Sequence, residues 1–126
     1  MITKGVISEV EVLLNKFFEV WNCSYSLEAT SGNVVIYQRT LDFDFIDYLV
    51  FSAINVSDGN GAECTMSIGG VSKYSDSGIN DGERIHELID CTAITGDNEV
   101  RILYNENSAI SGFLQDVTLF KYDEDA

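Results

Sequence analysis

IHELIDCTAITGDNEVRILY, residues 85–104, has the pattern of a strand, a turn and a second strand. Residues 95–98, TGDN, are all turn formers, and Val100 and Ile102 then alternate with Arg101. A period of two is that of a strand with one face buried. The stretch therefore predicts β-structure in which Val100 and Ile102 lie inside and Arg101 lies outside.

The same pattern extends outward along the chain, which contains no proline and concentrates its turn formers at 31–33, 57–61 and 75–82. The longest apolar run, Tyr48 to Val56, predicts a central strand covered on both faces. Further strands are expected at 25–29, 34–41, 63–68 and 112–122. Residues 72–83 are expected to form the largest surface loop, with a short strand at 71–74 opposite Met66 as the alternative.

Seven or eight short strands separated by polar turns predict an all-β fold, a two-sheet antiparallel β-sandwich. A jelly roll is our first choice. An immunoglobulin-like sandwich has the same periodicity, but Cys23, Cys64 and Cys91 lack the Cys-Trp-Cys order of that fold.

We expect three parts: an amino-terminal amphipathic segment (1–22), a β-sandwich domain (23–122) and a disordered acidic tail (123–126). Ser8 and Glu11 fit a capping box, which favours a helix from Ser8 to Trp21 over a strand. Both alternatives stay open, because the same residues include strand formers. A helical stripe would need a partner, and we predict an oligomer interface there. Its residues are Val10, Leu13, Leu14, Phe17 and Trp21.

Length and composition indicate one globular domain of 126 residues, with no apolar run of the roughly 18 residues that cross a bilayer. The start, Met-Ile-Thr-Lys-Gly, lacks the features of a secretory signal, so we expect synthesis in the cytoplasm. A net charge of −14 repels phosphates, which argues against nucleic acid and membrane insertion. The three cysteines show no zinc-site spacing and are expected to be small core residues.

The acidic loops offer one metal hypothesis, which is calcium. Asp58, Asn60 and Glu63 place hard oxygen ligands on a flexible loop, as Ca²⁺ prefers, and Asp76 with Asp81 is a second pairing. Neither has EF-hand spacing, and turns rich in Asp, Asn and Gly are mostly only turns. We otherwise expect no cofactor.

A sugar site would need an aromatic platform beside hydrogen-bonding side chains on neighbouring loops. The candidate residues are Tyr74, Asp76, Asn80, Asp81 and Arg84, with Asp58 and Asn60 from a nearby loop. The alternative is that Tyr74 packs over the edge of the sheet and Arg84 pairs with an acid.

His86 is the chain's only histidine, and no GxSxG turn or Cys-His motif accompanies it. We therefore predict no catalytic residues. An enzyme of unknown type ranks third among the functional hypotheses.

Two segments resemble a known family. The late strands of galactose-binding-like jelly-roll modules are similar to Glu87 to Ile102, which contains an Asp90-Cys91-Thr92 element and a Thr-Gly turn, and to Val117 to Phe120. Their central strand is similar to Tyr48 to Phe51. Such modules are frequent in tail and baseplate proteins of tailed phages and prophages, and in secreted glycosidases. The resemblance carries over no functional residue, and residues 1–21 depart from it.

The leading hypothesis from sequence is thus a non-enzymatic phage or prophage structural or adhesion subunit. It would be a homo-oligomer, would contact other virion proteins as a virion component, and could recognise a glycan on a host surface. The runner-up is a carbohydrate-binding module.

Overall fold

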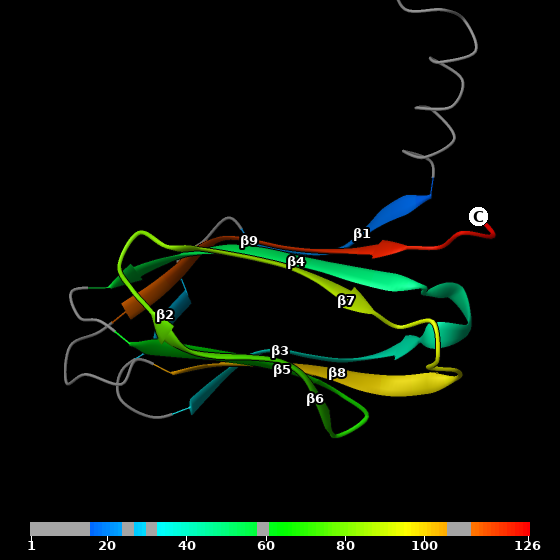
Figure 1. Ribbon diagram of the computed structural model, residues 1–126, viewed down its shortest axis with the longest axis horizontal. Coiled ribbons are helices and arrows are strands. Elements are labelled where there is room, and N and C mark those ends of the chain that lie inside the picture. The colour runs from blue at the N-terminus through cyan, green and yellow to red at the C-terminus, as the bar shows by residue number, and fades with distance from the viewer. Residues whose placement is uncertain (1–15, 24–26, 30–32, 58–60, 106–111) are drawn as a thin grey trace, which may run out of the picture.

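The computed structural model describes residues 16–23, 27–29, 33–57, 61–105 and 112–126. Within these residues the chain forms nine strands and one short 3-10 helix, arranged as two layers (Figure 1). The elements are β1 (Phe17–Cys23), β2 (Leu27–Ala29), β3 (Asn33–Asp42), η1 (Phe43–Phe45), β4 (Tyr48–Ser57), β5 (Ala62–Ile68), β6 (Val71–Ile79), β7 (Arg84–Asp90), β8 (Asp97–Asn105) and β9 (Gly112–Tyr122). The all-β prediction is confirmed.

Both sheets are antiparallel, and their strand orders are those of a jelly roll. Sheet A has the order β1-β9-β4-β7, with β2 also paired to β9, and sheet B has the order β3-β8-β5-β6. From β3 onward every connection crosses from one sheet to the other, except the β5–β6 hairpin. The chain thereby closes two sheets over one core, which confirms the predicted two-sheet sandwich.

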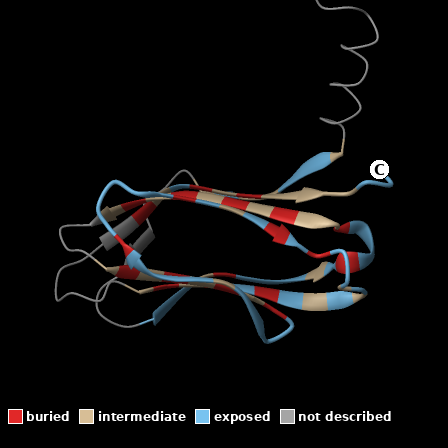
Figure 2. Cartoon of the chain, in the orientation of Figure 1, coloured by how far each residue is buried: buried red, intermediate tan, exposed pale blue. Residues whose placement is uncertain are grey.

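The core lies between the sheets and is made by simple alternation along the strands (Figure 2). On β8, Val100 and Ile102 have no exposed surface, whereas Arg101 is exposed. On β5 every second residue is buried, from Ala62 to Ile68. The period of two in the sequence therefore assigns the faces of these strands correctly.

The apolar run from Tyr48 to Val56 is the central strand β4, paired with β9 on one side and β7 on the other, as predicted. Leu49, Phe51 and Ala53 are buried between the sheets. The residues that alternate with them are only partly buried, so the outer face of β4 is less covered than predicted.

The preferred amino-terminal helix is wrong for residues 17–21. Phe17–Cys23 is strand β1, which pairs with β9 from Phe17↔Tyr122 to Cys23↔Val117. Backbone pairing with a long neighbouring strand outweighs the helical spacing of the apolar residues, since Phe, Val and Trp are good strand formers. The sheet thus begins at Phe17, inside the predicted segment 1–22, and residues 8–15 lie outside the described residues.

The acidic tail, expected to be disordered, makes defined hydrogen bonds. The Asp123 amide donates to the Lys16 carbonyl at 2.9 Å, and the Glu124 amide donates to Asp47 Oδ2 at 2.7 Å. These bonds tie the carboxyl terminus to the start of β1 and to the connection before β4.

Residues 72–83 form a strand over most of their length instead of the predicted loop. Val71–Ile79 is β6, which pairs with β5, and Tyr74 lies opposite Met66 as the alternative predicted. Gly69 and Gly70, with φ of 58° and 81°, make the hairpin turn that fixes this register. Ser and Gly are poor strand formers, but backbone pairing to β5 outweighs their propensity.

Candidate functional site

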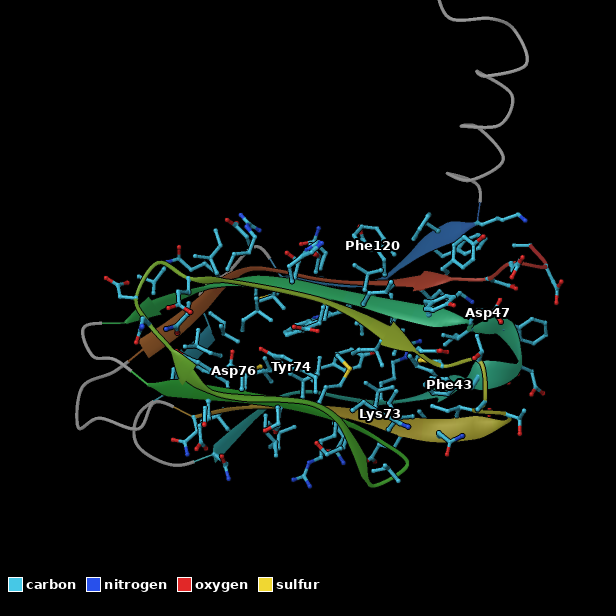
Figure 3. The ribbon with its side chains drawn as sticks, viewed as in Figure 1. Phe43, Asp47, Lys73, Tyr74, Asp76 and Phe120 are labelled. Atoms are coloured by element: carbon cyan, nitrogen blue, oxygen red, sulfur yellow. The ribbon has the colours of Figure 1, made fainter. Side chains whose placement is uncertain are left out.

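Of the residues predicted to bind a sugar, those that the structure describes do not all lie on one surface, and Asp58 and Asn60 lie outside the described residues. Tyr74 is half-buried and packs against the core, so its ring is not an open platform. Burial, together with Cys64, Asp76 and Glu87, raises the pKa of Tyr74 well above its ordinary value. Figure 3 shows Tyr74 and Asp76 on the side of β6 that faces sheet A.

Arg84, by contrast, lies on the outer face of sheet A, because its neighbour Ile85 points into the core. Its Nη1 donates to Ser52 Oγ on the adjacent strand at 3.3 Å. Asp76 accepts from the amide of Gly78 at 2.9 Å, which shapes the backbone near the end of β6. Arg84 and Asp76 therefore lie on different surfaces of the sandwich.

Asn80 and Asp81 lie in the turn between β6 and β7, and Asn55 fixes this turn. Asn55 is the single fully buried polar side chain in the part of the chain that the structure describes. Its Nδ2 donates to the carbonyls of Ile79 and Asn80 at 3.2 and 3.1 Å, and its Oδ1 accepts from the Tyr104 hydroxyl at 2.6 Å. The turn is thus held by β4 and β8 through buried hydrogen bonds, which is a structural role.

The calcium hypothesis stays a prediction. Asp58 and Asn60 lie outside the described residues, and Glu63 alternates with buried Ala62 and Cys64 on β5, so it points away from the core. Among the described residues no three His, Cys, Asp or Glu side chains are grouped to hold a metal ion.

The predicted oligomer interface divides between two faces where the structure describes it. Phe17 is 43% exposed on the outer side of sheet A, and Trp21 stacks on Tyr37 between the sheets, with ring centroids 5.0 Å apart. Helical spacing had placed both on one stripe. The strand, with an irregularity between Glu19 and Trp21, turns them to opposite sides. Val10, Leu13 and Leu14 are outside the described residues.

An apolar surface covers one end of the outer side of sheet A, and we call it the aromatic face. Tyr48 and Phe17 both pair with Tyr122, and the ring centroids lie 6.1 and 4.9 Å from that of Tyr122. A groove of about 170 Å³ runs between these three rings and Leu88, which is 65% exposed. Val50 and Phe120 form the next row, and Figure 3 shows Phe120 pointing outward. The face comprises Phe17, Tyr48, Val50, Leu88, Phe120 and Tyr122.

Sequence reasoning did not identify this face, although its signal was present. On β4 the outward positions 48 and 50 are apolar, as are the inward positions between and beside them. On β7 the outward position 88 is a leucine, where alternation with the inward Ile85 and Ile89 would place a polar residue. We interpreted such positions as core. On β9, Leu119 is buried and Phe120 faces outward.

The outer side of sheet B has the opposite character. Its central strands present Thr65, Ser67, Glu99 and Arg101, and Gln38 on β3 donates to Glu99 at 3.1 Å. A sandwich with both sheets facing water would be polar on both outer sides. The exposed apolar side chains of sheet B, Val34, Val35 and Val71, lie on its edge strands β3 and β6, whereas those of sheet A gather around one groove.

His86 also lies on the outer side of sheet A, opposite Ser52. No hydrogen bond to its imidazole occurs within the described residues, and the Ser52 hydroxyl is engaged by Arg84. A nucleophile needs a base within hydrogen-bond reach that a third group orients, and this pair has no such arrangement. No described helix is long and apolar enough to span a membrane.

From two buried thiols we predict how the free energy of unfolding depends on pH. Burial raises the pKa of Cys64 from 9.0 to about 12 and that of Cys91 to about 11. The folded state therefore keeps protons that the unfolded state loses above about pH 9. The free energy of unfolding falls as the pH rises from about 9 to about 11 for Cys91 and to about 12 for Cys64. Urea unfolding across this range should show a shallower fall in the double variant Cys64→Ala, Cys91→Ala. An equally steep fall in that variant would contradict the assignment.

No protein-family model and no curated protein sequence matches the chain. Solved structures match in fold. A protein of particles derived from infectious bursal virus has a TM-score of 0.50 at 10% identity, over 86% of this chain and 32% of that chain. A carbohydrate-binding module in complex with calcium and xylotriose has a TM-score of 0.48 at 16% identity, over 86% and 92%. A family two carbohydrate esterase from Cellvibrio japonicus has a TM-score of 0.43 at 13% identity, over 85% and 33%.

At identities this low the likeness concerns the fold alone, and the chain spans about a third of the viral protein. The strand order of the two sheets confirms the jelly-roll part of the sequence resemblance. Its association with phage tails and baseplates stays a prediction.

Proposed function

We propose that this protein is a non-enzymatic structural subunit that assembles with copies of itself through the aromatic face. The observation that supports the proposal is the difference between the two outer sides. The central strands of sheet B present Thr65, Ser67, Glu99 and Arg101 to solvent, whereas sheet A presents three clustered aromatic rings and Leu88. Contiguous apolar surface rimmed by polar residues is typical of protein–protein contacts.

The geometry of the rings favours a protein partner over a sugar. A sugar chain stacks on a flat, open ring and hydrogen-bonds to polar groups beside it. Here the Phe17 and Tyr48 rings are tilted by 53° and 56° against the Tyr122 ring. They therefore form the walls of an apolar groove, which suits an inserted apolar side chain better than a sugar ring.

The charge distribution of the chain also favours the aromatic face as the contact between two copies. Each chain carries a net charge of −14, so two copies repel one another over most approaches. None of the six residues of the aromatic face is acidic, and Arg84 and His86 extend the same side of β7. The carboxylates that border the face, Glu19 opposite Phe120 and Asp90 opposite Tyr48, are few against the chain's twenty-one acidic residues. A two-fold arrangement would place each Leu88 against the aromatic groove of the other copy.

The setting we propose is a phage or prophage particle, which the sequence resemblance implies, with other virion proteins as further partners. The predicted stripe of Val10, Leu13 and Leu14 precedes Phe17 in the chain, and we include it in the proposed interface. The particle and the position in it would follow from identifying the assembled neighbours.

Light scattering on the full chain should show a homo-oligomer that Leu88→Lys dissociates. Placing an unpaired ammonium in an apolar interface is expected to cost about 2 kcal/mol or more, which weakens association roughly 30-fold. Leu88 is 65% exposed, so the fold of the single chain should be unaffected.

Val71→Lys is the matched control, because Val71 is an apolar residue of similar exposure, 57%, on sheet B. It should leave the oligomer intact. A monomeric wild-type chain, or equal dissociation by both lysine variants, would refute the proposed interface.

A further inference from the structure

A second cavity lies where the edge strands of the two sheets approach each other, away from the aromatic face. It has a volume of about 220 Å³ and is lined from β1, β3, η1 and the end of β9. Its charged lining residues are Glu19, Arg39, Asp42 and Lys121. We call it the edge pocket.

The charged side chains around the edge pocket form no ion pairs with one another within the described residues. Two of the chain's seven basic side chains meet two carboxylates there, yet no ion pair joins them within the described residues. Lys121 instead lies 5.3 Å from the centroid of the Phe18 ring. Asp42 accepts one bond, from the amide of Asp44 at 3.0 Å, and its carboxylate keeps further acceptor capacity.

Arg39 has a second unusual neighbour. The Tyr37 hydroxyl is buried near the Arg39 guanidinium, and within the described residues no group meets the distance and angle of a hydrogen bond to it. Burial raises the pKa of Tyr37 more than the Arg39 charge lowers it, which agrees with a buried neutral phenol next to this cation. Arg39 thus brings guanidinium donors to the lining of the pocket.

An exposed aromatic ring completes the lining. Phe45 is 56% exposed although its neighbour Phe43 is buried, and the two are separated by one residue in η1. The 3-10 helix directs Phe43 into the core and leaves Phe45 at the pocket beside Ile46. A ring presented in this way offers an open apolar face.

We infer that the edge pocket binds a single sugar residue of a glycan. Its formal charge is zero, so it does not select an ionic ligand, and the −14 of the whole chain disfavours an anion. Each sugar hydroxyl can donate to a carboxylate and accept from a cation, while the C–H face of the ring packs on Phe45. Sites for drug-sized ligands occupy about 300–1,000 Å³, so the smaller volume suits one ring.

This inference adds a ligand site to the proposed subunit and does not depend on its assembly. The sugar set predicted from sequence is dispersed, whereas the edge pocket gathers an aromatic ring and four charged side chains from four elements. An irregularity in the β1–β9 pairing between Glu19 and Trp21 lets both Glu19 and Val20 reach the pocket.

The test is a titration of the full chain with glucose, galactose, mannose and N-acetylglucosamine, each added singly and followed by amide NMR. At least one sugar should shift the amides of Val20, Phe45 and Ile46. Phe45→Ala should weaken its binding about tenfold, and Arg39→Met should do the same. Arg101→Met, an exposed arginine on the outer side of sheet B, should change nothing.

Two results would overturn the inference. One is the absence of shifts at the edge pocket with every sugar at high millimolar concentration. The other is a stronger response to glycine, a small zwitterion, than to any sugar. If Phe45→Ala does not fold, Arg39→Met alone tests the inference. A sugar affinity of Arg39→Met equal to that of the wild type would also overturn it. Leu88→Lys should bind the sugar like the wild type, which separates this outcome from that of the assembly.

Discussion

Asn55→Ala is expected to lower the free energy of unfolding by about 3 kcal/mol. The substitution removes three side-chain hydrogen bonds at once, two to the carbonyls of Ile79 and Asn80 and one from the Tyr104 hydroxyl. Water cannot replace the lost partners easily, because Tyr104 and Ile79 are fully buried. Chemical unfolding followed by circular dichroism measures the loss.

Asn22→Ala is the control, since Asn22 is an exposed asparagine on β1 and its replacement should cost less than about 0.5 kcal/mol. Tyr104→Phe removes only one of the three bonds and should lie between the two, at about 1 to 2 kcal/mol. In the double variant the two losses should not add, because both act on one hydrogen-bond network. Additive losses would show that Asn55 and Tyr104 act separately.

The core could be predicted because its residues obey one local rule. Val100 and Ile102 are buried and Arg101 is exposed because a strand turns successive side chains to opposite faces, and only one of those faces meets the other sheet. Strands with such alternation carry their own face assignment in the sequence. The two-sheet sandwich followed from counting them, whereas the preference for a jelly roll rested on the order of the cysteines and on the family resemblance.

Two elements could not be predicted because pairing with another strand decides them. The sequence of β6 has the Ser, Asp and Gly content of a loop, and β5 makes it a strand. Phe17 and Trp21 have helical spacing, and β9 makes their segment a strand. β9 is far from β1 in the sequence, so no local pattern could indicate this pairing. β5 adjoins β6 across the short Gly69-Gly70 turn, and there the alternative prediction of a strand opposite Met66 was right.

The candidate sites depended on contacts that no local pattern contains. Tyr74 and Arg84 are ten residues apart in sequence but belong to different sheets, so a cluster inferred from proximity along the chain was dispersed. The edge pocket combines Glu19, Arg39, Phe45 and Lys121, which span most of the chain. Such a set can be found only once strand order is known.

Trp21→Ala is expected to lower the free energy of unfolding by about 3 kcal/mol, whereas Phe17→Ala should cost less than about 1 kcal/mol. Trp21 packs against the core and stacks on Tyr37, so its removal leaves a cavity between the edges of the two sheets. Phe17 faces outward beside Tyr122, and its removal exposes no core.

Both variants should be measured in the Leu88→Lys background, because an assembling protein gains apparent stability from its partners and would make Phe17 look structural. In the wild-type background we expect the opposite order for association, with the larger effect from Phe17→Ala and the smaller from Trp21→Ala. Phe17→Ala should weaken the oligomer by removing one wall of the groove, while the fraction of Trp21→Ala that remains folded should associate normally. If Trp21→Ala instead dissociated the oligomer without lowering stability, the residue would belong to the interface predicted from the helical pattern, and its position between the sheets would be wrong.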